Sequence, residues 1–471
     1  MNFISLEYAL LFLVVFSLYY ALPRYQIGIL LVSSLFFYGW EEPWALPLLL
    51  ATSAISSAIT FSILRDPLTR KRQWMATGII INLLVLGFFK YKFLFIEQIP
   101  GYTHTDIGLE ALLYAPLPIG ISFYTFHCIS LIGDAYRKQF IGSDIADFGS
   151  AGAFFRNVLL YLIFFPQIVA GPIVKAHQFM PQIRRKAISD VPFAECARWI
   201  IWGMFFKSFV ADNIAQITVW MNNPESFLQL GRYDLIILLF AFSAQIFADF
   251  AGYSAIAIGS AALLGYSLPI NFNRPYVARS FSDFWRRWHM SLSSFLREYL
   301  YIPLGGNRKG TTRTYINLFL TMALGGLWHG AAISFLLWGM AHGAALCFER
   351  ALSPTARYFP AGTIRGALSG HVYTLFVFIV ISALWLFFKL QDFSDASLYV
   401  KAVLTAPTLL NLHNYQYAVV AIYVAPVIIT HCMPRALSER NGKLSALTYG
   451  AMLMLAVFDK GPTDAFIYFQ F

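Results

Sequence analysis

Long apolar runs separated by short polar breaks cover most of this 471-residue chain. Runs that suggest membrane spans lie near 4–22, 26–39, 44–64, 74–96, 112–133, 153–173, 195–220 and 233–264, and again near 315–348, 371–389, 415–432 and 443–458. A spanning helix needs about 20 predominantly apolar residues, so some runs are short for a full span and others can hold two helices. The pattern predicts an all-α polytopic membrane protein with about 11 transmembrane helices in one domain over 1–471.

The stretch 265–314 interrupts this pattern. From Ser280 to Tyr299, apolar residues recur at steps of three and four, with arginines on the opposite side. This spacing predicts an amphipathic helix that lies in the membrane interface instead of crossing it. Ser280 and Asp283 have the spacing of a capping box, which places the start of the helix there. The glycine-rich segment IPLGGNRKGTT that follows is predicted to be a loop.

The apolar run 315–348 is too long for one straight span. As a single helix it would measure roughly 50 Å, against about 30 Å for a hydrocarbon core. Gly325, Gly326 and Gly330 supply the expected break, and His329 lies inside it. Non-helical backbone at membrane depth is tolerated where protein buries it or where it lines a cavity. We therefore expect a broken helix with an imidazole in a cavity wall.

Composition and charge agree with a membrane protein. Hydrophobic residues make up 58% of the chain and charged residues 12%, about half the charged share of a soluble domain. The net charge of +10 is spread over short Lys and Arg clusters between apolar runs, as positive-inside loops and anionic lipid headgroups require. Nucleic-acid binding is not expected, because the sequence lacks a stripe of basic residues and stacking aromatic residues. Glu7, with no basic residue before the first apolar run, indicates a retained span and not a cleaved signal peptide.

His329 is the strongest candidate for chemistry. An ionisable residue at membrane depth is by default a candidate for function, and an imidazole can take a proton near neutral pH. A hydroxyl that attacks an acyl thioester needs such a base. The alternative is a histidine that only stabilises the glycine-rich bend. His289, on the predicted interfacial helix, is either a residue that orients an acyl group or stabilises an oxyanion, or an amphipathic side chain at the membrane surface.

Three further polar residues in apolar runs have weaker claims. Asp134 follows His127 by two helical turns, so a polar contact between helices explains both. His342 is next to a glycine and is expected to pack between helices. Asp249 stands as a lone carboxylate that either orients a histidine, lines an ion path or bonds to a neighbouring helix. No HExxH or cysteine cluster suggests a metal site, and no GxSxG elbow suggests a serine acyl-enzyme.

Two adjacent blocks, SFSDFWRRWHMSLSSFLREYLYIPLGGNRKG and LFLTMALGGLWHGA, resemble the membrane-bound O-acyltransferase family. They are most similar to the branch that contains the membrane subunit of alginate O-acetylation. Four supporting blocks are PIGISFYTFHCIS at 118–130, FFPQIVAGPIVK at 164–175, QIFADFAGYS at 245–254 and the C-terminal FIYFQF. One block departs from its relatives, because DFAGYSAIAIG has alanines where they tend to read DFSGYSDMAIG. No catalysis is assigned to it.

The resemblance implies a ring of helices around a central tunnel that joins the two membrane faces. The invariant histidine of the family matches His329, and its second polar position matches His289. Trp285, Trp288 and Trp328 are then expected to shape the tunnel, with Asp283 as a supporting residue. The phosphates of an acyl donor would meet the basic side chains of Arg286, Arg287, Arg308 and Lys309, although interfacial anchoring explains these residues equally well.

The resemblance also implies a function. Its branch takes acetyl groups from a cytosolic donor, expected to be acetyl-CoA, with no permanently bound cofactor. It passes them across a bacterial inner membrane to an extracytoplasmic partner acetyltransferase that modifies a polysaccharide such as alginate. LGGNR favours acetyl transfer over the D-alanyl branch. The alternatives are D-alanyl or other acyl transfer to a cell-envelope polymer, and an acyl-donor transporter or scaffold without chemistry. FIYFQF is a candidate docking tail.

Overall fold

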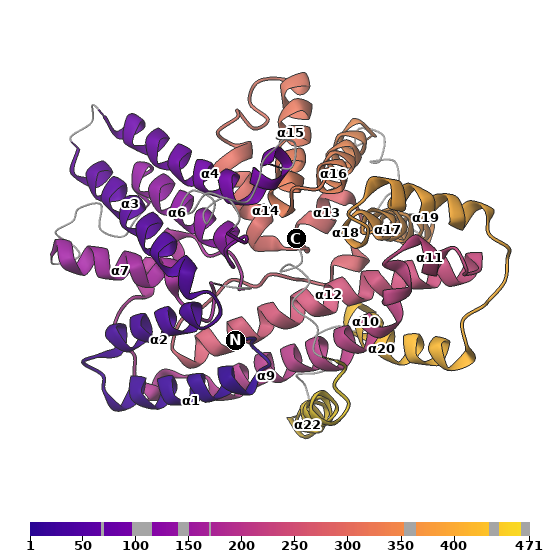
Figure 1. Ribbon diagram of the computed structural model, residues 1–471, viewed down its shortest axis with the longest axis horizontal. Coiled ribbons are helices and arrows are strands. Elements are labelled where there is room, and N and C mark those ends of the chain that lie inside the picture. Colours follow the sequence, from indigo (N-terminus) through magenta and orange to yellow (C-terminus); the bar gives the residue numbers. More distant parts are fainter. Residues whose placement is uncertain are drawn as a thin grey trace, which may run out of the picture. The chain divides into compact units, whose positions relative to one another are not determined.

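The computed structural model describes residues 1–66, 70–96, 115–139, 150–168, 171–352, 364–432 and 442–462 (Figure 1). All regular secondary structure in these ranges is helical, which confirms the predicted all-α class. The chain forms two compact units. Unit 1 comprises Met1–Ala197 and Ala257–Pro269, and unit 2 comprises Arg198–Ile256 and Ile270–Phe471. The expectation of one membrane domain stays a prediction.

Several helices meet the length and composition that a membrane span requires. Among the described residues, five do so: Pro43–Arg65, Lys71–Lys92, Arg232–Leu263, Gly370–Lys389 and Asn414–Cys432. Shorter apolar helices cover Leu6–Ala21, Ala151–Ile163 and Leu444–Phe458. The chain is therefore a multi-pass membrane protein. The number of about 11 spans and their arrangement in a ring around a tunnel stay predictions.

Unit 1 is built from helices that pack closely through small residues. Its elements are α1 (Leu6–Ala21), α2 (Gln26–Glu41), η1 (Pro43–Ala45), α3 (Leu46–Arg65), α4 (Lys71–Ile96), α6 (Ile121–Tyr136), α7 (Ala151–Ile163), α8 (Ala176–Phe179), η3 (Met180–Gln182) and η4 (Ile188–Asp190). Helices α3, α4 and α6 lie side by side (Figure 1). A Cβ added to Gly78 of α4 would lie 2.7 Å from Ile132 Cδ1 and 3.0 Å from Ile59 Cγ2, so a larger residue there would require these side chains to shift.

The elements of unit 2 carry most of the predicted site residues. The helix α9 (Phe193–Met204) leads into the unit, followed by η5 (Phe205–Ala211), α10 (Asp212–Thr218), η6 (Val219–Met221), α11 (Pro224–Phe227), α12 (Arg232–Leu263), η7 (Pro275–Val277), α13 (Phe281–Trp285), α14 (Met290–Leu296), η8 (Arg297–Tyr301), α15 (Thr311–His329), α16 (Ile333–Leu352), α17 (Ile364–Leu384), α18 (Leu386–Lys389), α19 (Phe393–Thr405), α20 (Asn414–Cys432) and α22 (Gly442–Phe458). The η5 and η8 segments are π-helical. The run 233–264 forms one helix of 32 residues.

The predicted single amphipathic helix from Ser280 to Tyr299 is wrong. The structure has two short helices, α13 and α14, separated at residues 286–289. Its start is correct, because the Ser280 hydroxyl accepts a hydrogen bond from the Asp283 amide as an N-cap. The predicted loop is also confirmed, with left-handed backbone at Gly305, Gly306 and Gly310.

The run 315–348 is broken as predicted, but at one position only. Gly330 ends α15 in an extended conformation (φ −169°, ψ 169°), directly after His329. Gly326, in contrast, lies inside α15 and serves close packing of α15 against α16. A Cβ added to Gly326 would lie 2.2 Å from the Phe335 carbonyl oxygen, and one added to Gly339 would lie 2.3 Å from that of Met322. The two helices therefore form a tight hairpin that fixes the position of His329.

Candidate functional site

His329 is the last residue of α15, and aromatic rings enclose its imidazole. His329 is buried, with only 5% of the residue exposed. Its ring centroid lies 4.9 Å from that of Trp328, 5.1 Å from Trp338 and 5.0 Å from Phe388. The interplanar angles are between 68° and 88°, so the neighbouring rings stand edge-on to it. The site therefore combines a titratable ring with walls that exclude water.

His289 lies between α13 and α14 with a left-handed backbone (φ 42°, ψ 55°). It is buried, and its Nδ1 donates a hydrogen bond to the Asn271 side-chain oxygen at 3.1 Å. The Ser291 hydroxyl donates to the same oxygen at 2.9 Å. The proton of the neutral ring is thereby assigned to Nδ1, which makes Nε2 the basic nitrogen. The fold thus presets both the orientation and the tautomer of this histidine.

The structure brings the two predicted histidines to one indole. The ring of Trp328 lies 4.9 Å from that of His329 and 6.4 Å from that of His289, measured between centroids. Phe250 of α12 makes a T-shaped contact with the His289 ring at 4.6 Å between centroids. The two imidazoles therefore belong to one site in unit 2, although 40 positions separate them in the sequence.

The other predicted tryptophans belong to the same aromatic group. Trp288 is buried, with its ring centroid 4.7 Å from that of Trp385. Trp285 lies 5.7 Å from Trp338, which in turn contacts His329. The sequence analysis missed Trp338, Trp385, Phe388 and His342 as members of this group. A signal existed for two of them, because Trp338 and His342 are four residues apart and share one helix face.

Asp283 supports the segment before His289. Its carboxylate accepts hydrogen bonds from Arg287 Nε at 2.8 Å and from the Arg279 amide at 3.0 Å. Burial raises the pKa of Asp283, but these two bonds and the positive charges of Arg287 and Arg286 outweigh it and hold the pKa below its usual value. Of the predicted donor-phosphate contacts, Arg287 thus pairs with Asp283, whereas three are exposed: Arg286, Arg308 and Lys309. Their contact with a donor stays a prediction.

Asp249 has a buried cationic partner that the sequence analysis missed. Lys207 Nζ lies 2.7 Å from Asp249 Oδ1 and 2.6 Å from Asp212 Oδ1, and all three residues are buried. Lys207 belongs to the π-helical segment η5, within the apolar run FFKSFVA. Three roles were considered for Asp249, and a polar contact with a neighbouring helix agrees best with this ion pair. A lysine inside an apolar run was itself a signal that such a pair exists.

Comparison with known proteins decides the family. The sequence profile described as MBOAT, membrane-bound O-acyltransferase family, matches residues 150–388, which include both His289 and His329. The chain belongs to the membrane-bound O-acyltransferase family. The resemblance found in the sequence is thereby confirmed, and so is an O-acyltransferase as the class of enzyme.

Individual relatives cover most of the chain. It is 35% identical over 402 residues to "Probable alginate O-acetylase AlgI" of Pseudomonas syringae pv. tomato, covering 83% of this chain and 73% of that protein. It is 32% identical over 488 residues to "Peptidoglycan O-acetyltransferase" of Helicobacter pylori, covering 94% and 91%. The match to "Teichoic acid D-alanyltransferase" of Bacillus subtilis is 28% over 245 residues, covering 49% and 58%.

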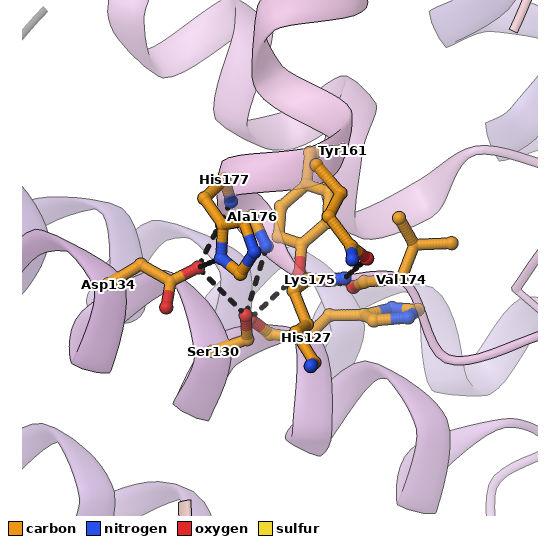
Figure 2. Close-up of polar contacts among 9 residues, drawn as sticks. His127, Ser130, Asp134, Tyr161, Val174, Lys175, Ala176 and His177 are labelled. Atoms are coloured by element: carbon orange, nitrogen blue, oxygen red, sulfur yellow. Dashed lines mark hydrogen bonds and ion pairs between the residues drawn. The ribbon is translucent and has the colours of Figure 1, made fainter. Parts of the chain in front are cut away.

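A second polar cluster lies in unit 1 (Figure 2). Asp134 Oδ2 accepts hydrogen bonds from the His177 ring Nδ1 at 2.9 Å, from the His177 amide at 3.0 Å and from the Ser130 hydroxyl at 3.3 Å. His127 has a different partner. Its ring Nε2 accepts a hydrogen bond from the side-chain Nε2 of Gln167 at 3.0 Å. The expected polar contact between helices is confirmed for Asp134, whose partner His177 lies on α8, whereas Gln167, the partner of His127, lies in the turn after α7. His177, which was not among the candidate residues found in the sequence, is thus the partner of Asp134.

This cluster holds the described segment 171–176, which leads into α8, against neighbouring helices. The Tyr161 hydroxyl of α7 donates to the Val174 carbonyl at 2.8 Å, and the Ala176 amide donates to Ser130 Oγ at 2.9 Å (Figure 2). Both bonds tie the non-helical chain before α8 to helices α6 and α7. A segment without its own helical bonds needs such partners to be stable inside a membrane protein.

Proposed function

We propose that this protein is a polysaccharide O-acetyltransferase of a bacterial inner membrane. In this proposal it takes acetyl groups from acetyl-CoA in the cytosol and transfers them towards an extracytoplasmic polysaccharide. The observation that carries the proposal is His329 at the end of α15, enclosed by aromatic rings and sharing the Trp328 indole with His289. The names of the relatives that match 83% and 94% of the chain both specify O-acetylation.

The geometry supports His329 as the general base. Its imidazole takes the proton of an acceptor hydroxyl while the hydroxyl oxygen attacks the thioester carbonyl. The carbon–sulfur bond then breaks, and the leaving thiolate receives the proton back from the imidazolium. The rings of Trp328, Trp338 and Phe388 around the imidazole keep out water, which would otherwise compete as the acceptor.

His289 fits a positioning role for the acceptor. Because its Nδ1 proton is committed to Asn271, the neutral ring offers Nε2 as a hydrogen-bond acceptor. A hydroxyl group is a donor that this nitrogen can orient. Stabilisation of an oxyanion by His289 would require a second proton on the ring, so we favour orientation of the hydroxyl over that role.

Acetyl transfer is favoured over D-alanyl transfer by the extent of the matches. The D-alanyltransferase relative matches 49% of the chain, whereas the O-acetylase and O-acetyltransferase relatives match 83% and 94%. We propose that the acetyl group reaches a glycan such as alginate through an extracytoplasmic partner acetyltransferase. The C-terminal FIYFQF, the candidate docking tail for this partner, lies outside the described residues.

The test is polymer O-acetylation in cells that express the wild type, His329→Ala or His329→Gln at matched membrane abundance, with the neighbouring genes present. Removal of a general base is expected to lower acetyl ester by about 100-fold or more. Loss of acetyl ester from one polymer only would also identify that polymer as the acceptor. Unchanged acetylation in both variants would contradict the proposed activity. It would favour the alternative, a scaffold that holds another transferase.

A further inference from the structure

His342 is a second imidazole in the aromatic group around His329. It lies one turn after Trp338 on α16 and is 0% exposed. Its ring centroid is 4.6 Å from that of Trp338 and 5.0 Å from that of Trp285. Trp338 is itself 5.1 Å from His329, so a single indole separates the two imidazoles. The function proposed above assigns no role to this residue.

Polar atoms in this group lack hydrogen-bond partners. Neither ring nitrogen of His342 bonds to any residue that the structure describes, and the same holds for Nε1 of Trp285, Trp338 and Trp385. A buried polar group without a partner costs free energy. Phenylalanine would make the same ring contacts at each position without this cost. Packing alone therefore does not account for the choice of one histidine and three tryptophans beside His329.

The chemistry of these groups restricts what they can bind. An indole N–H is a donor only, whereas a neutral imidazole offers one donor and one acceptor. The group thus presents more donors than acceptors, which suits a ligand that carries an acceptor oxygen. His342 has aromatic ring neighbours: Phe284, Trp285 and Trp338. A carbonyl oxygen on a small acyl group has these properties, and it gains negative charge during acyl transfer.

We propose that His342, together with the indole N–H groups of Trp285 and Trp338, binds the carbonyl oxygen of the acyl group that reacts at His329. This inference rests on the proposed acyl transfer and adds an acyl-binding position to it. Donation to the carbonyl strengthens as the oxygen becomes negative, so the position contributes to the rate as well as to binding. This role explains why rings with N–H donors, and not phenylalanine rings, occupy these positions.

The test compares His342→Phe and His342→Gln with the wild type. Polymer O-acetylation is measured in cells at matched membrane abundance, and the unfolding temperature is measured on the purified full-length protein. His342→Phe is expected to lower acetylation by about 100-fold, as loss of one such donor typically does. Its unfolding temperature is expected to stay equal or rise, because a buried group without partners is removed. His342→Gln keeps a donor and is expected to retain most of the activity.

His431→Phe is the matched control. His431 is also a buried histidine of unit 2, but its Nδ1 is bonded to the Val427 carbonyl within α20 at 2.8 Å. It should leave acetylation unchanged. Wild-type acetylation in His342→Phe, or a clear fall in its unfolding temperature, overturns the inference. If His329→Ala abolishes acetylation and His342→Phe does not, only the role of His342 is lost. Retained acetylation in His329→Ala removes the proposed function itself.

Discussion

His289 has a backbone conformation that residues with a Cβ rarely adopt. With φ at 42° and ψ at 55°, it lies in the left-handed region, which costs an L-residue about 1–2 kcal/mol. The hydrogen bond to Asn271 and the packing against Phe250 compensate for that cost. Strained backbone of this kind gathers at functional sites, where the surroundings must hold one conformation.

This conformation predicts an unusual order of stability. His289→Gly and His289→Ala both remove the imidazole, but only glycine adopts the left-handed region without a penalty. We expect His289→Gly to be more stable than His289→Ala by about 1 kcal/mol, the reverse of the order inside a helix. The unfolding transitions of the two purified variants measure this difference. Greater stability of the alanine variant would contradict the conformation at this residue.

The ion pairs of Lys207 give a second prediction for single residues. Lys207→Met leaves Asp212 and Asp249 buried without their cation, which is expected to cost about 3–5 kcal/mol. Adding Asp249→Asn removes one of the two orphaned charges, so the double variant should recover part of the loss. A double-mutant cycle on unfolding stability measures the coupling. Additive effects of the two substitutions would show that the side chains do not interact.

At the level of elements, the sequence predicts helix existence well and helix breaks poorly. The periodicity of 280–299 suggested one helix, because it records only local side-chain spacing. The break arises from distant partners: the Met290 amide donates to the Asn271 carbonyl and the Asn273 amide donates to the Arg287 carbonyl, both at 2.9 Å. These bonds replace helical ones between α13 and α14, and no local pattern reveals them.

The α15–α16 hairpin offers a prediction with an adjacent control. Gly326→Ala would place its methyl group 2.2 Å from the Phe335 carbonyl oxygen, so the helices must separate and His329 must move. We expect a loss of both stability and acetylation. Gly325→Ala meets only the end of the Leu296 side chain, at 3.1 Å, which can move. It should be tolerated and can gain up to about 1 kcal/mol in helix propensity.

Both glycine variants can be compared in one experiment, through polymer acetylation and unfolding temperature at matched membrane abundance. Equal behaviour of the two would argue against the close approach of α15 and α16. The contact at Gly326 also explains why the helix break predicted there was wrong. Gly325 and Gly326 were predicted to break the helix, since glycine is flexible, but Gly326 is required because no side chain fits at the contact.

For the whole molecule, composition and apolar runs were sufficient to predict an all-α multi-pass membrane protein. They also singled out His329 as a candidate, because an ionisable residue stands out in apolar sequence, whereas His289 gained its place from the family resemblance; the catalytic roles of both stay predictions. The identity of the partners in contacts between distant segments was not predictable. His177 seemed unimportant until the fold placed its imidazole on Asp134, and Asp249 seemed unpaired until the fold placed Lys207 beside it.

The side from which the donor arrives is a property of the whole molecule. Basic residues cluster at 184–186 and at 308–309, and the positive-inside rule predicts a cytosolic location for loops with such clusters. We therefore predict that sealed inverted membrane vesicles, which expose the cytosolic face, release CoA when acetyl-CoA is added, whereas sealed right-side-out vesicles do so only after permeabilisation. Vesicles with His329→Ala should release none in either orientation. Release from intact right-side-out vesicles but not from inverted vesicles would exclude a cytosolic donor site, and uptake of acetyl groups without CoA release would indicate a transporter.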